Sequence, residues 1–291
     1  MARGNGAAMT MKRKSPFSIF IPCSILSDVP SLIEKTFKVG QIARAASIFR
    51  VDSIVLYRDH KRTTIEDGRL IKEILEYAET PQYLRKRLFP LTPSLKYAGL
   101  IPPLRTPHHP LASSKIGFRD GYVLKSSRSS SIVEIGLPSP VECPAPLTQG
   151  SRVTLRLEGG SWVPSSREEA PYYWGYSVDL SFKPLTDALK RKPPEGIYGG
   201  IIGTSRKGEH ISDASPRLLD LLSKQQRLAL LFGSPGEGLD EILSREGASL
   251  KDVADMTVNF APDQGTATIR TEEAVIISLA ALDAVGAANP K

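Results

Sequence analysis

Short apolar runs recur towards both ends of the chain and predict buried strands. Most of them are followed by sequence with helical spacing, as in residues 70–78, where apolar side chains recur every three or four positions. Strands that are apolar throughout and alternate with helices are typical of a parallel sheet covered on both faces. The pattern therefore predicts an α/β domain with strands at residues 17–22, 53–57, 196–204, 227–232 and 256–261.

The middle of the chain has a different pattern, in which apolar and polar residues alternate. Every second side chain is apolar in residues 152–158 and 176–182, and residues 121–126 and 131–137 are expected to be companion strands. Such alternation is typical of antiparallel strands with one face on a core and the other in water. Four or five short strands in about 90 residues predict a small barrel of the OB type, and a small sandwich is the alternative.

These patterns divide the chain into three parts. We expect a disordered basic tail at residues 1–15, a discontinuous α/β domain at residues 16–90 and 183–291, and an inserted antiparallel barrel at residues 91–182. Proline and serine become more frequent within the insert, which is the compositional change that marks its ends.

The net charge of the 291-residue chain is +7, which is compatible with an RNA partner. Four of these charges lie in the tail, on Arg3, Lys12, Arg13 and Lys14, where no acidic residue offsets them. The remainder of the chain is therefore only mildly basic, and charge alone gives weak support for RNA binding. The tail itself is expected to contact nucleic acid if it has a function.

The cysteine content and the apolar runs limit the class of protein. Cys23 and Cys143 are the two cysteines, and they form no CxxC pair, so neither a zinc ribbon nor a disulfide framework is expected. A reducing compartment and a cytoplasmic location fit this usage. No apolar run reaches the roughly 20 residues of a membrane helix, and the N-terminus lacks the apolar segment of a secretory signal. The pair His108-His109 is expected to lie in a solvated loop, and we expect no metal site.

Residues 230–242 join a buried strand to a helix through unusually flexible backbone. Gly233, Gly236 and Gly238 follow the apolar run, and helical spacing resumes at Leu239. Three glycines are more than a plain turn requires, so either special dihedral angles or a closely approaching ligand is indicated. Turns between a strand and a helix often bind phosphates or cofactors.

Two other segments carry candidate chemistry. In residues 39–57 a helix places Ile42, Ala45, Ala46 and Phe49 on one apolar face, and Arg44 points about 200° away from Ile42. In residues 259–282 a strand ends in a turn, and a helix begins near Thr271. We expect Thr271 to cap this helix, and the two glutamates after it to favour the positive end of the helix dipole.

The order and content of these three segments resemble the SPOUT superfamily of RNA methyltransferases. The family's first motif has a glycine, an arginine four residues later, a helix of small residues and a strand. Its second motif is a strand running into FG-x-E-G-x-GL, and its third is a glycine followed by S-L-N and a helix. The matching positions are Gly40, Arg44, Ala46, Phe49 and Val51 in the first, Phe232, Gly233, Gly236, Gly238 and Leu239 in the second, and Gly265, Thr268, Ile269 and Arg270 in the third.

The stretches GQIARAASIFRVD, YLRKRLFPL, YAGLIPPLRTPHH and QGTATIRTEEA resemble more specifically the subfamily that archaea and eukaryotes share, which carries an inserted OB-type barrel. The resemblance implies a C-terminal trefoil knot that holds S-adenosylmethionine, and a homodimer whose sites are completed across the subunit interface. The residues it implies for cofactor binding are Thr204, Leu231, Phe232, Gly233, Ser234, Gly236, Gly238, Asn259, Phe260, Ala261, Pro262, Gln264, Gly265, Thr268 and Ile269.

Catalysis is assigned to Arg44 and Arg270, because a guanidinium that stays protonated can stabilise negative charge on an acceptor but is a poor base. Pro235 replaces the glutamate common in ribose-methylating members, and residues 268–270 replace the usual serine, leucine and asparagine. These departures favour a base nitrogen, such as N3 of uridine, over a ribose 2′-hydroxyl. The alternative from a different functional class is a non-catalytic protein that binds RNA or assists assembly.

The expected substrate is ribosomal RNA, transfer RNA or another structured RNA. Basic side chains in the insert, near its start, in residues 39–57 and in the stretch TSRKGE are the candidates for phosphate contact. They are Arg50, Arg85, Lys86, Arg87, Arg152, Arg156 and Arg206.

Overall fold

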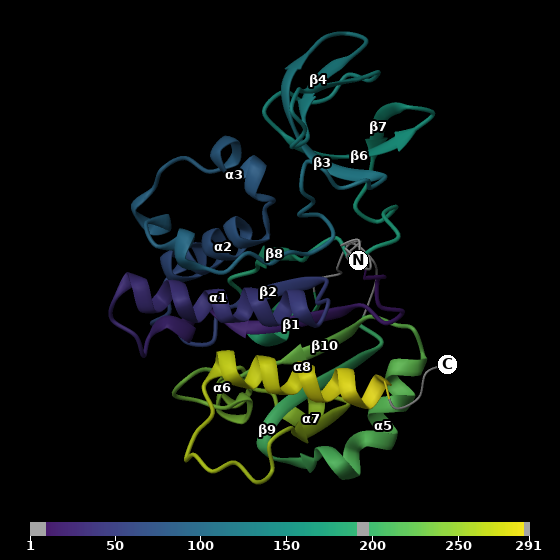
Figure 1. Cartoon of the computed structure of the whole chain (residues 1–291). Helices are drawn as coiled ribbons and strands as arrows, with labels where there is room; N and C mark the ends of the chain where they lie inside the picture. The colour runs from purple at the N-terminus through teal and green to yellow at the C-terminus, as the bar shows by residue number, and fades with distance from the viewer. Residues whose placement is uncertain (1–9, 191–197, 288–291) are drawn as a thin grey trace, which may run out of the picture. The chain divides into compact units, whose positions relative to one another are not determined.

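The computed structural model describes residues 10–190 and 198–287, which form two compact units. The larger unit contains Lys14–Ala78, Pro93–Pro102 and the chain from Tyr176 onward. The smaller unit contains Glu79–Thr92, Pro103–Gly175 and the residues before Lys14. Figure 1 shows the elements of both units with the labels used below.

The larger unit is built on a six-stranded sheet in which every neighbouring pair is parallel. The strand order is β11-β9-β10-β1-β2-β8. The predicted parallel sheet is thereby confirmed, and its first two strands have the predicted bounds; residues 196 and 197 of a third lie outside the described residues. The strands are β1 Phe17–Pro22, β2 Ser53–Tyr57, β8 Ser177–Leu180, β9 Gly200–His210, β10 Leu228–Leu231 and β11 Met256–Asn259.

Helices cover this sheet and seal its core. On one face Phe20, Val55 and Leu231 pack against apolar side chains of α4, α6 and α7. Helices α1 and α8 are in contact with each other and lie side by side across the sheet in Figure 1. The helices of this unit are α1 Leu32–Ile48, α2 Ile65–Glu79, α4 Leu185–Lys190, α5 Ile211–Ser223, α6 Leu239–Arg245, α7 Leu250–Val253 and α8 Thr271–Ala287, with 3-10 turns at Cys23–Leu26, Pro93–Leu95 and Ala98–Leu100.

The prediction for residues 176–182 is wrong. They were expected to form an antiparallel strand of the insert, but β8 pairs in parallel with β2, so that Ile54 lies opposite Val178. Strand β8 is the last strand in the sheet order, and its side chains are half-buried rather than fully buried. An edge strand has one neighbouring strand and is less covered than the inner strands, so its sequence is not an unbroken apolar run.

The smaller unit contains an antiparallel sheet with the order β5-β4-β3-β6-β7. Strands β5 and β7, at the two ends of this order, also contact each other, so the sheet is nearly closed into a barrel. Its core is made by Val123, Val133, Ile135, Cys143 and Leu155. The elements are α3 Gln82–Leu88, β3 Phe118–Ser126, β4 Ser131–Glu134, β5 Val141–Cys143, β6 Arg152–Glu158 and β7 Ser161–Ser165.

Residues 10–15 are not disordered, contrary to the expectation for the tail; residues 1–9 lie outside the described residues. The Lys12 ammonium donates to the main-chain oxygens of Arg167 at 3.0 Å and Glu168 at 2.8 Å. The Ser15 hydroxyl donates to the main-chain oxygen of Leu222 at 2.6 Å.

A buried ionic network ties together distant parts of the smaller unit. The Glu79 carboxylate is paired with Arg152 at 2.6 Å, Arg167 at 3.1 Å and His108 at 3.2 Å. Arg152 also pairs with Asp120 at 2.5 Å. Burial by itself would raise the pKa of Glu79, but the cations around it, Arg152 first, hold that pKa well below its usual range. Arg152, which was predicted to bind RNA, is therefore paired with two carboxylates within this unit.

His108 and His109 do not lie in a solvated loop, so that expectation is wrong. His108 is fully buried, and the Nε2 atoms of both rings lie within hydrogen-bond distance of the main-chain oxygen of Glu79, at 2.8 and 2.6 Å. Burial, followed by the neighbouring His108, lowers the pKa of His109 from 6.5 to about 3. His109 is therefore neutral at pH 7.

We expect the stability of the protein to fall as the pH is lowered from 6.5 towards 3. In this window the unfolded chain protonates His109 while the folded chain does not, so acid favours unfolding, with a slope of at most about 1.4 kcal/mol per pH unit. Urea unfolding at pH 7, 6 and 5 measures this slope. A His109→Asn variant with the same slope as the wild type would contradict the assignment.

Two features are absent from the part of the chain that the structure describes. No helix there is long and apolar enough to cross a membrane. No group of three or more His, Cys, Asp or Glu side chains in that part is arranged to hold a metal ion.

Candidate functional site

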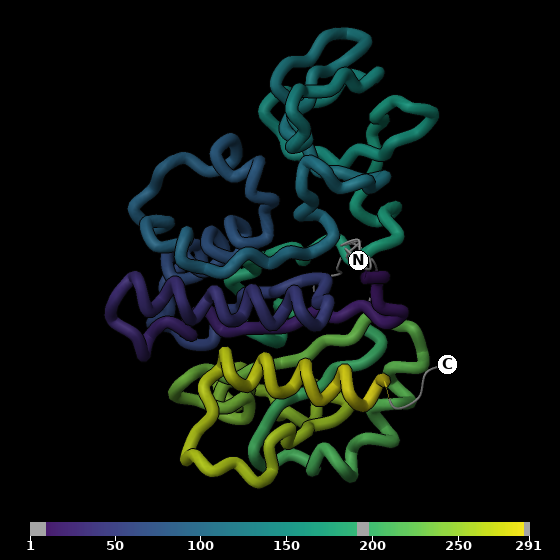
Figure 2. The backbone as a smooth tube through the Cα atoms, viewed as in Figure 1, coloured from purple at the N-terminus to yellow at the C-terminus, as the bar shows by residue number. Residues whose placement is uncertain are grey.

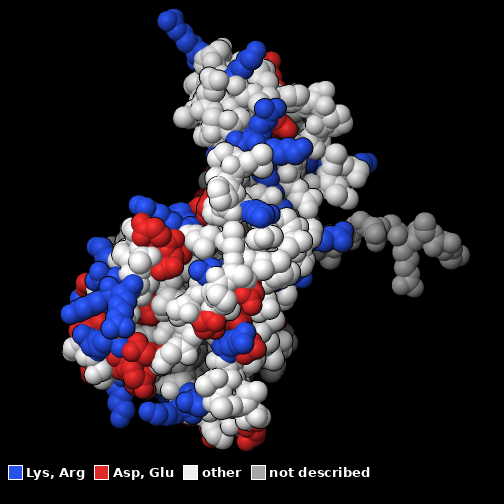
Figure 3. All heavy atoms as spheres, turned by 90° about the vertical axis from the view of Figure 1, so that its left-hand side faces the viewer, with Lys and Arg blue, Asp and Glu red and all other residues white. Residues whose placement is uncertain are grey.

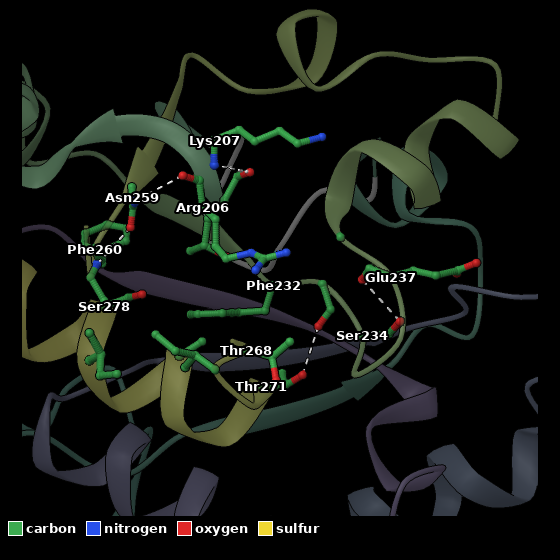
Figure 4. Close-up of a pocket in the computed structure, with 18 of the residues that line it drawn as sticks. Arg206, Lys207, Phe232, Ser234, Glu237, Asn259, Phe260, Thr268, Thr271 and Ser278 are labelled. Atoms are coloured by element: carbon green, nitrogen blue, oxygen red, sulfur yellow. Dashed lines mark hydrogen bonds between the residues drawn. The ribbon is translucent and has the colours of Figure 1, made fainter. Parts of the chain in front are cut away.

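A cavity of about 280 Å³ lies at the carboxyl ends of strands β10 and β11 of the larger unit, beside the middle of β9. Its walls come from five places: residues 204–207 of β9, the glycine loop that follows β10, the start of α6, the end of β11 with the loop that follows it, and the first two turns of α8. Figure 4 shows their side chains converging on one space, and Figure 2 shows the chain from β11 running through a wide loop into α8. Ligands of parallel α/β sheets bind at this carboxyl edge.

Most of the predicted cofactor-binding residues line this cavity. They are Thr204, Phe232, Gly233, Ser234, Gly236, Gly238, Asn259, Phe260, Ala261, Gln264, Thr268 and Ile269. Leu231, Pro262 and Gly265 are not part of the lining. Leu231 is fully buried, and its main-chain oxygen accepts a hydrogen bond from the Thr204 hydroxyl at 2.8 Å.

The glycine loop is folded tightly on itself. The Ser234 amide donates to the main-chain oxygen of Glu237 at 2.9 Å, and a Cβ on Gly233 would lie 2.8 Å from that same oxygen. None of Gly233, Gly236 and Gly238 has a positive φ angle, so a left-handed backbone does not explain them. At Gly233 the reason is close approach of the loop's own backbone.

A buried tyrosine holds one end of this loop, and an exposed ion pair holds the other. The Tyr57 hydroxyl donates to the main-chain oxygen of Phe232 at 2.6 Å, and burial keeps the pKa of Tyr57 well above its usual value. At the other end Arg245 makes a bidentate pair with Glu237, at 2.5 and 2.6 Å, and donates to the main-chain oxygen of Asp59 at 2.8 Å. The hydrogen bonds from Arg245 lower the pKa of Glu237. The loop is therefore preorganised.

Helix α8 begins differently from the prediction. Thr271 is its first residue rather than its cap, since the Ala274 amide donates to the main-chain oxygen of Arg270 at 2.8 Å. The Arg270 amide donates a hydrogen bond to the Glu273 carboxylate, also at 2.8 Å. The Thr271 hydroxyl is thereby free of the capping role and donates to the main-chain oxygen of Gly233 at 3.1 Å. Two walls of the cavity are joined by this bond.

A buried group of charges fixes the same end of α8. The Lys38 ammonium, on α1, lies 2.6 Å from the Asp28 carboxylate and 3.3 Å from that of Glu272. Lys38 and Glu272 are 4 and 5% exposed. Because Glu272 follows Thr271 directly, this ion triad holds the start of α8 against α1 beside the cavity.

The two arginines predicted for catalysis do not line the cavity. Arg44 lies half-buried on α1. Of the predicted apolar stripe Ile42, Ala45 and Ala46 are buried, whereas Phe49 follows the helix and is half-buried. Arg270 has an exposed side chain just before α8. Arg206 alone among the predicted RNA-binding residues lies in the lining.

The other predicted RNA-binding residues are spread over both units. In the larger unit Arg50 pairs with Asp283 at 3.1 Å. In the smaller unit Arg87 pairs with Glu134 at 3.1 Å, Arg156 pairs with Glu158 at 2.7 Å, and Lys86 is exposed. The Arg85 side chain donates to the main-chain oxygen of Thr80 at 3.0 Å.

Sequence reasoning missed part of the lining. Ala274, Ile277 and Ser278 face the cavity from α8, and Asp240 and Glu241 reach it from α6. Only the spacing of Ala274, Ile277 and Ser278 at three and four residues could have indicated a shared helix face. Which face of α8 meets a ligand depends on how the helix docks.

The chain belongs to a family of RNA methyltransferases. The model of a family described as putative RNA methyltransferase matches residues 16–282, which covers nearly the whole chain. The resemblance found in the sequence motifs is thereby confirmed.

Relatives come from eukaryotes and archaea. The chain is 36% identical over 308 residues to a 28S rRNA (uridine-N(3))-methyltransferase of Homo sapiens, covering 95% of this chain and 80% of that protein. It is 33% identical over 305 residues to a protein of the same description in Drosophila melanogaster, covering 92% of this chain but only 62% of that protein's length. An uncharacterized protein of Halobacterium salinarum is 32% identical over 288 residues, covering 91% of this chain and 98% of that protein.

Proposed function

We propose that this protein is an S-adenosylmethionine-dependent methyltransferase that modifies N3 of uridine in ribosomal RNA. The observation that carries the proposal is the preorganised cavity at the carboxyl edge of the sheet, in a chain that belongs to an RNA methyltransferase family. We take the target nucleoside, uridine, and its methylated atom, N3, from the names of the human and Drosophila relatives. They also agree with the departures from the ribose-methylating motifs at Pro235 and residues 268–270.

The residues present fit S-adenosylmethionine. Ile269 and Ile277 offer apolar surface for an adenine ring, above the buried Phe232. Hydroxyl, amide and carboxylate groups around them suit a ribose and an amino-acid end; they include Ser234, Asn259, Glu237 and Asp240 among others. When bound, this cofactor supplies a methyl group already activated on a positively charged sulfur. The protein then has to position the acceptor and stabilise its charge.

The finer fold assignment is part of the same proposal. We assign the C-terminal part of the larger unit to the knotted SPOUT arrangement and the smaller unit to the OB type. The nearly closed five-stranded sheet supports the second assignment. We assign RNA contact outside the cavity to the exposed basic side chains of the smaller unit, Lys86 first. Figure 3 shows basic and acidic side chains interspersed on one face, so charge does not mark a single path there.

We propose further that the protein is a homodimer joined through α1 and α8. Ile33, Phe37 and Ile48 on α1 and Ile276 on α8 are between 36 and 51% exposed. The three residues of α1 and Arg44 fall within an arc of about 60° on a helix with 3.6 residues per turn. An exposed apolar stripe on two adjacent helices is typical of an interface. A role for Arg44 in catalysis would follow from its place on this stripe, near the site of the partner subunit.

The variant Phe37→Asp is expected to convert the dimer to a monomer, since it puts a charge into an apolar contact. Light scattering coupled to size exclusion measures the mass. Lys224→Asp, at the exposed residue that follows α5, is the matched control and stays dimeric. A wild type that is monomeric at all concentrations tested would contradict the interface.

The proposed function is tested with the purified protein and ribosomal RNA from cells that lack it. Calorimetry with S-adenosylhomocysteine measures cofactor binding, and mass spectrometry of digested nucleosides identifies the product. We expect binding and N3-methyluridine. Binding with a 2′-O-methylated product would move the acceptor to the ribose, and RNA binding without cofactor binding would favour a non-catalytic assembly protein.

A further inference from the structure

Strand β9 contains a five-residue bulge beside the cavity. Gly203 pairs with Thr257 of β11 and Glu209 pairs with Val258, so two consecutive residues of β11 are matched by residues six apart in β9. The residues between them, 204–208, have no paired residue in β11. A bulge of this size gives up ladder hydrogen bonds, and bulges beside active sites re-aim side chains.

The bulge is held in one conformation. A Cβ on Gly208 would lie 2.7 Å from the main-chain carbon of Val258, so only glycine allows the strand to return. The Asn259 side chain donates to the main-chain oxygen of Arg206 at 3.0 Å. The Arg206 guanidinium donates in turn to the main-chain oxygen of Ala267 at 2.6 Å, which ties the bulge to the loop before α8.

The bulge brings positive charge to the cavity. Arg206 and Lys207 are the basic residues in its lining, whereas Arg44 and Arg270 lie outside it. Figure 4 shows the Arg206 side chain pointing into the cavity, towards Phe232 and Thr268, while Lys207 extends along the rim. Only one hydrogen bond of the Arg206 side chain is made within the described residues, so most of the donors of its guanidinium remain for a ligand.

Methylation of uridine at N3 requires such a charge. The N3–H proton passes to solvent, which leaves a negative charge shared by N3 and the two ring oxygens. The N3 electron pair then forms the bond to the methyl carbon, and the carbon–sulfur bond breaks with its electrons remaining on sulfur. A cation donating hydrogen bonds to a ring oxygen stabilises the anion without blocking N3.

We propose that Arg206 is the catalytic residue that stabilises the deprotonated uracil ring. This inference rests on the proposed function and assigns the role of charge stabilisation to the bulge of the same subunit. Arg206 cannot act as the base, because its guanidinium stays protonated. Its planar pair of donors suits a carbonyl oxygen of the ring.

The test compares Arg206→Gln, which keeps a donor for Ala267 but loses the charge, with Arg206→Lys, which keeps the charge. We expect Arg206→Gln to lower kcat about 100-fold. The pH profile of kcat should shift to higher pH, because the uracil proton is lost less readily without the cation. Affinity for S-adenosylhomocysteine should stay within threefold of the wild type, and Arg206→Lys should recover part of kcat. Arg69→Ala, an exposed site on α2, is the control.

Two results would overturn the proposal. A rise in KM with unchanged kcat and pH profile would place Arg206 on an RNA phosphate. Loss of S-adenosylhomocysteine binding in both variants would show that Arg206 contacts the cofactor or maintains the shape of the cavity. A wild type that makes no N3-methyluridine would instead refute the proposed function. The product of the wild type is therefore identified before the variants are compared.

Discussion

The variant Gly233→Ala is expected to lose affinity for S-adenosylhomocysteine by more than about 100-fold, equivalent to about 2.7 kcal/mol. The added Cβ would lie 2.8 Å from the Glu237 main-chain oxygen and 3.1 Å from the Gly238 Cα. Both are backbone atoms and cannot move aside singly, so the loop has to open. Opening breaks the bond from the Ser234 amide to Glu237 and widens the cavity.

Calorimetry measures this loss, and circular dichroism with thermal unfolding checks that the fold persists. Gly99→Ala is the matched control, because a Cβ there meets nothing within 4 Å. An affinity of Gly233→Ala close to that of the wild type would show that the loop does not need its present shape.

The variant Lys38→Met is expected to lower the free energy of unfolding by about 3–5 kcal/mol. It removes the buried partner of Glu272, whose Oε2 atom makes no hydrogen bond within the described residues and lies 3.3 Å from the Lys38 ammonium. A carboxylate left unpaired at 5% exposure is costly because it has lost both water and its counter-ion.

Urea unfolding measures the change. The double variant Lys38→Met, Glu272→Met should recover much of the stability, because the charge that had been left unpaired is gone. Lys224→Met is the control: its pair with Asp220 is exposed, and its loss should cost less than about 1 kcal/mol. An equal loss in the single and the double variant would argue that the packing of the lysine stem, and not its charge, matters.

Sequence reasoning predicted the parallel sheet well because its inner strands are buried on both sides and read as unbroken apolar runs. It failed for β8, because this half-buried edge strand lacks the unbroken apolar run of the inner strands. It also failed for His108, because a histidine between prolines carries no sign of the carboxylate that meets it from a distant part of the chain.

The candidate site was predicted in part for similar reasons. The glycine loop is a local feature, and it does line the cavity. The contribution of α8 depends on helix docking, and the bulge of β9 depends on pairing with β11; neither is encoded in a short stretch. The glycines were expected to admit a ligand, yet Gly233 is required by the backbone of its own loop.

The position of Glu79 determines where the smaller unit can be cut from the chain. This carboxylate gathers Arg152, Arg167 and His108, although it is the last residue of α2. A fragment that starts at residue 91, where composition suggests a boundary, removes the carboxylate partner of Arg167 and leaves Arg152 with Asp120 alone. Transplanting the barrel into another enzyme should therefore begin at or before residue 79.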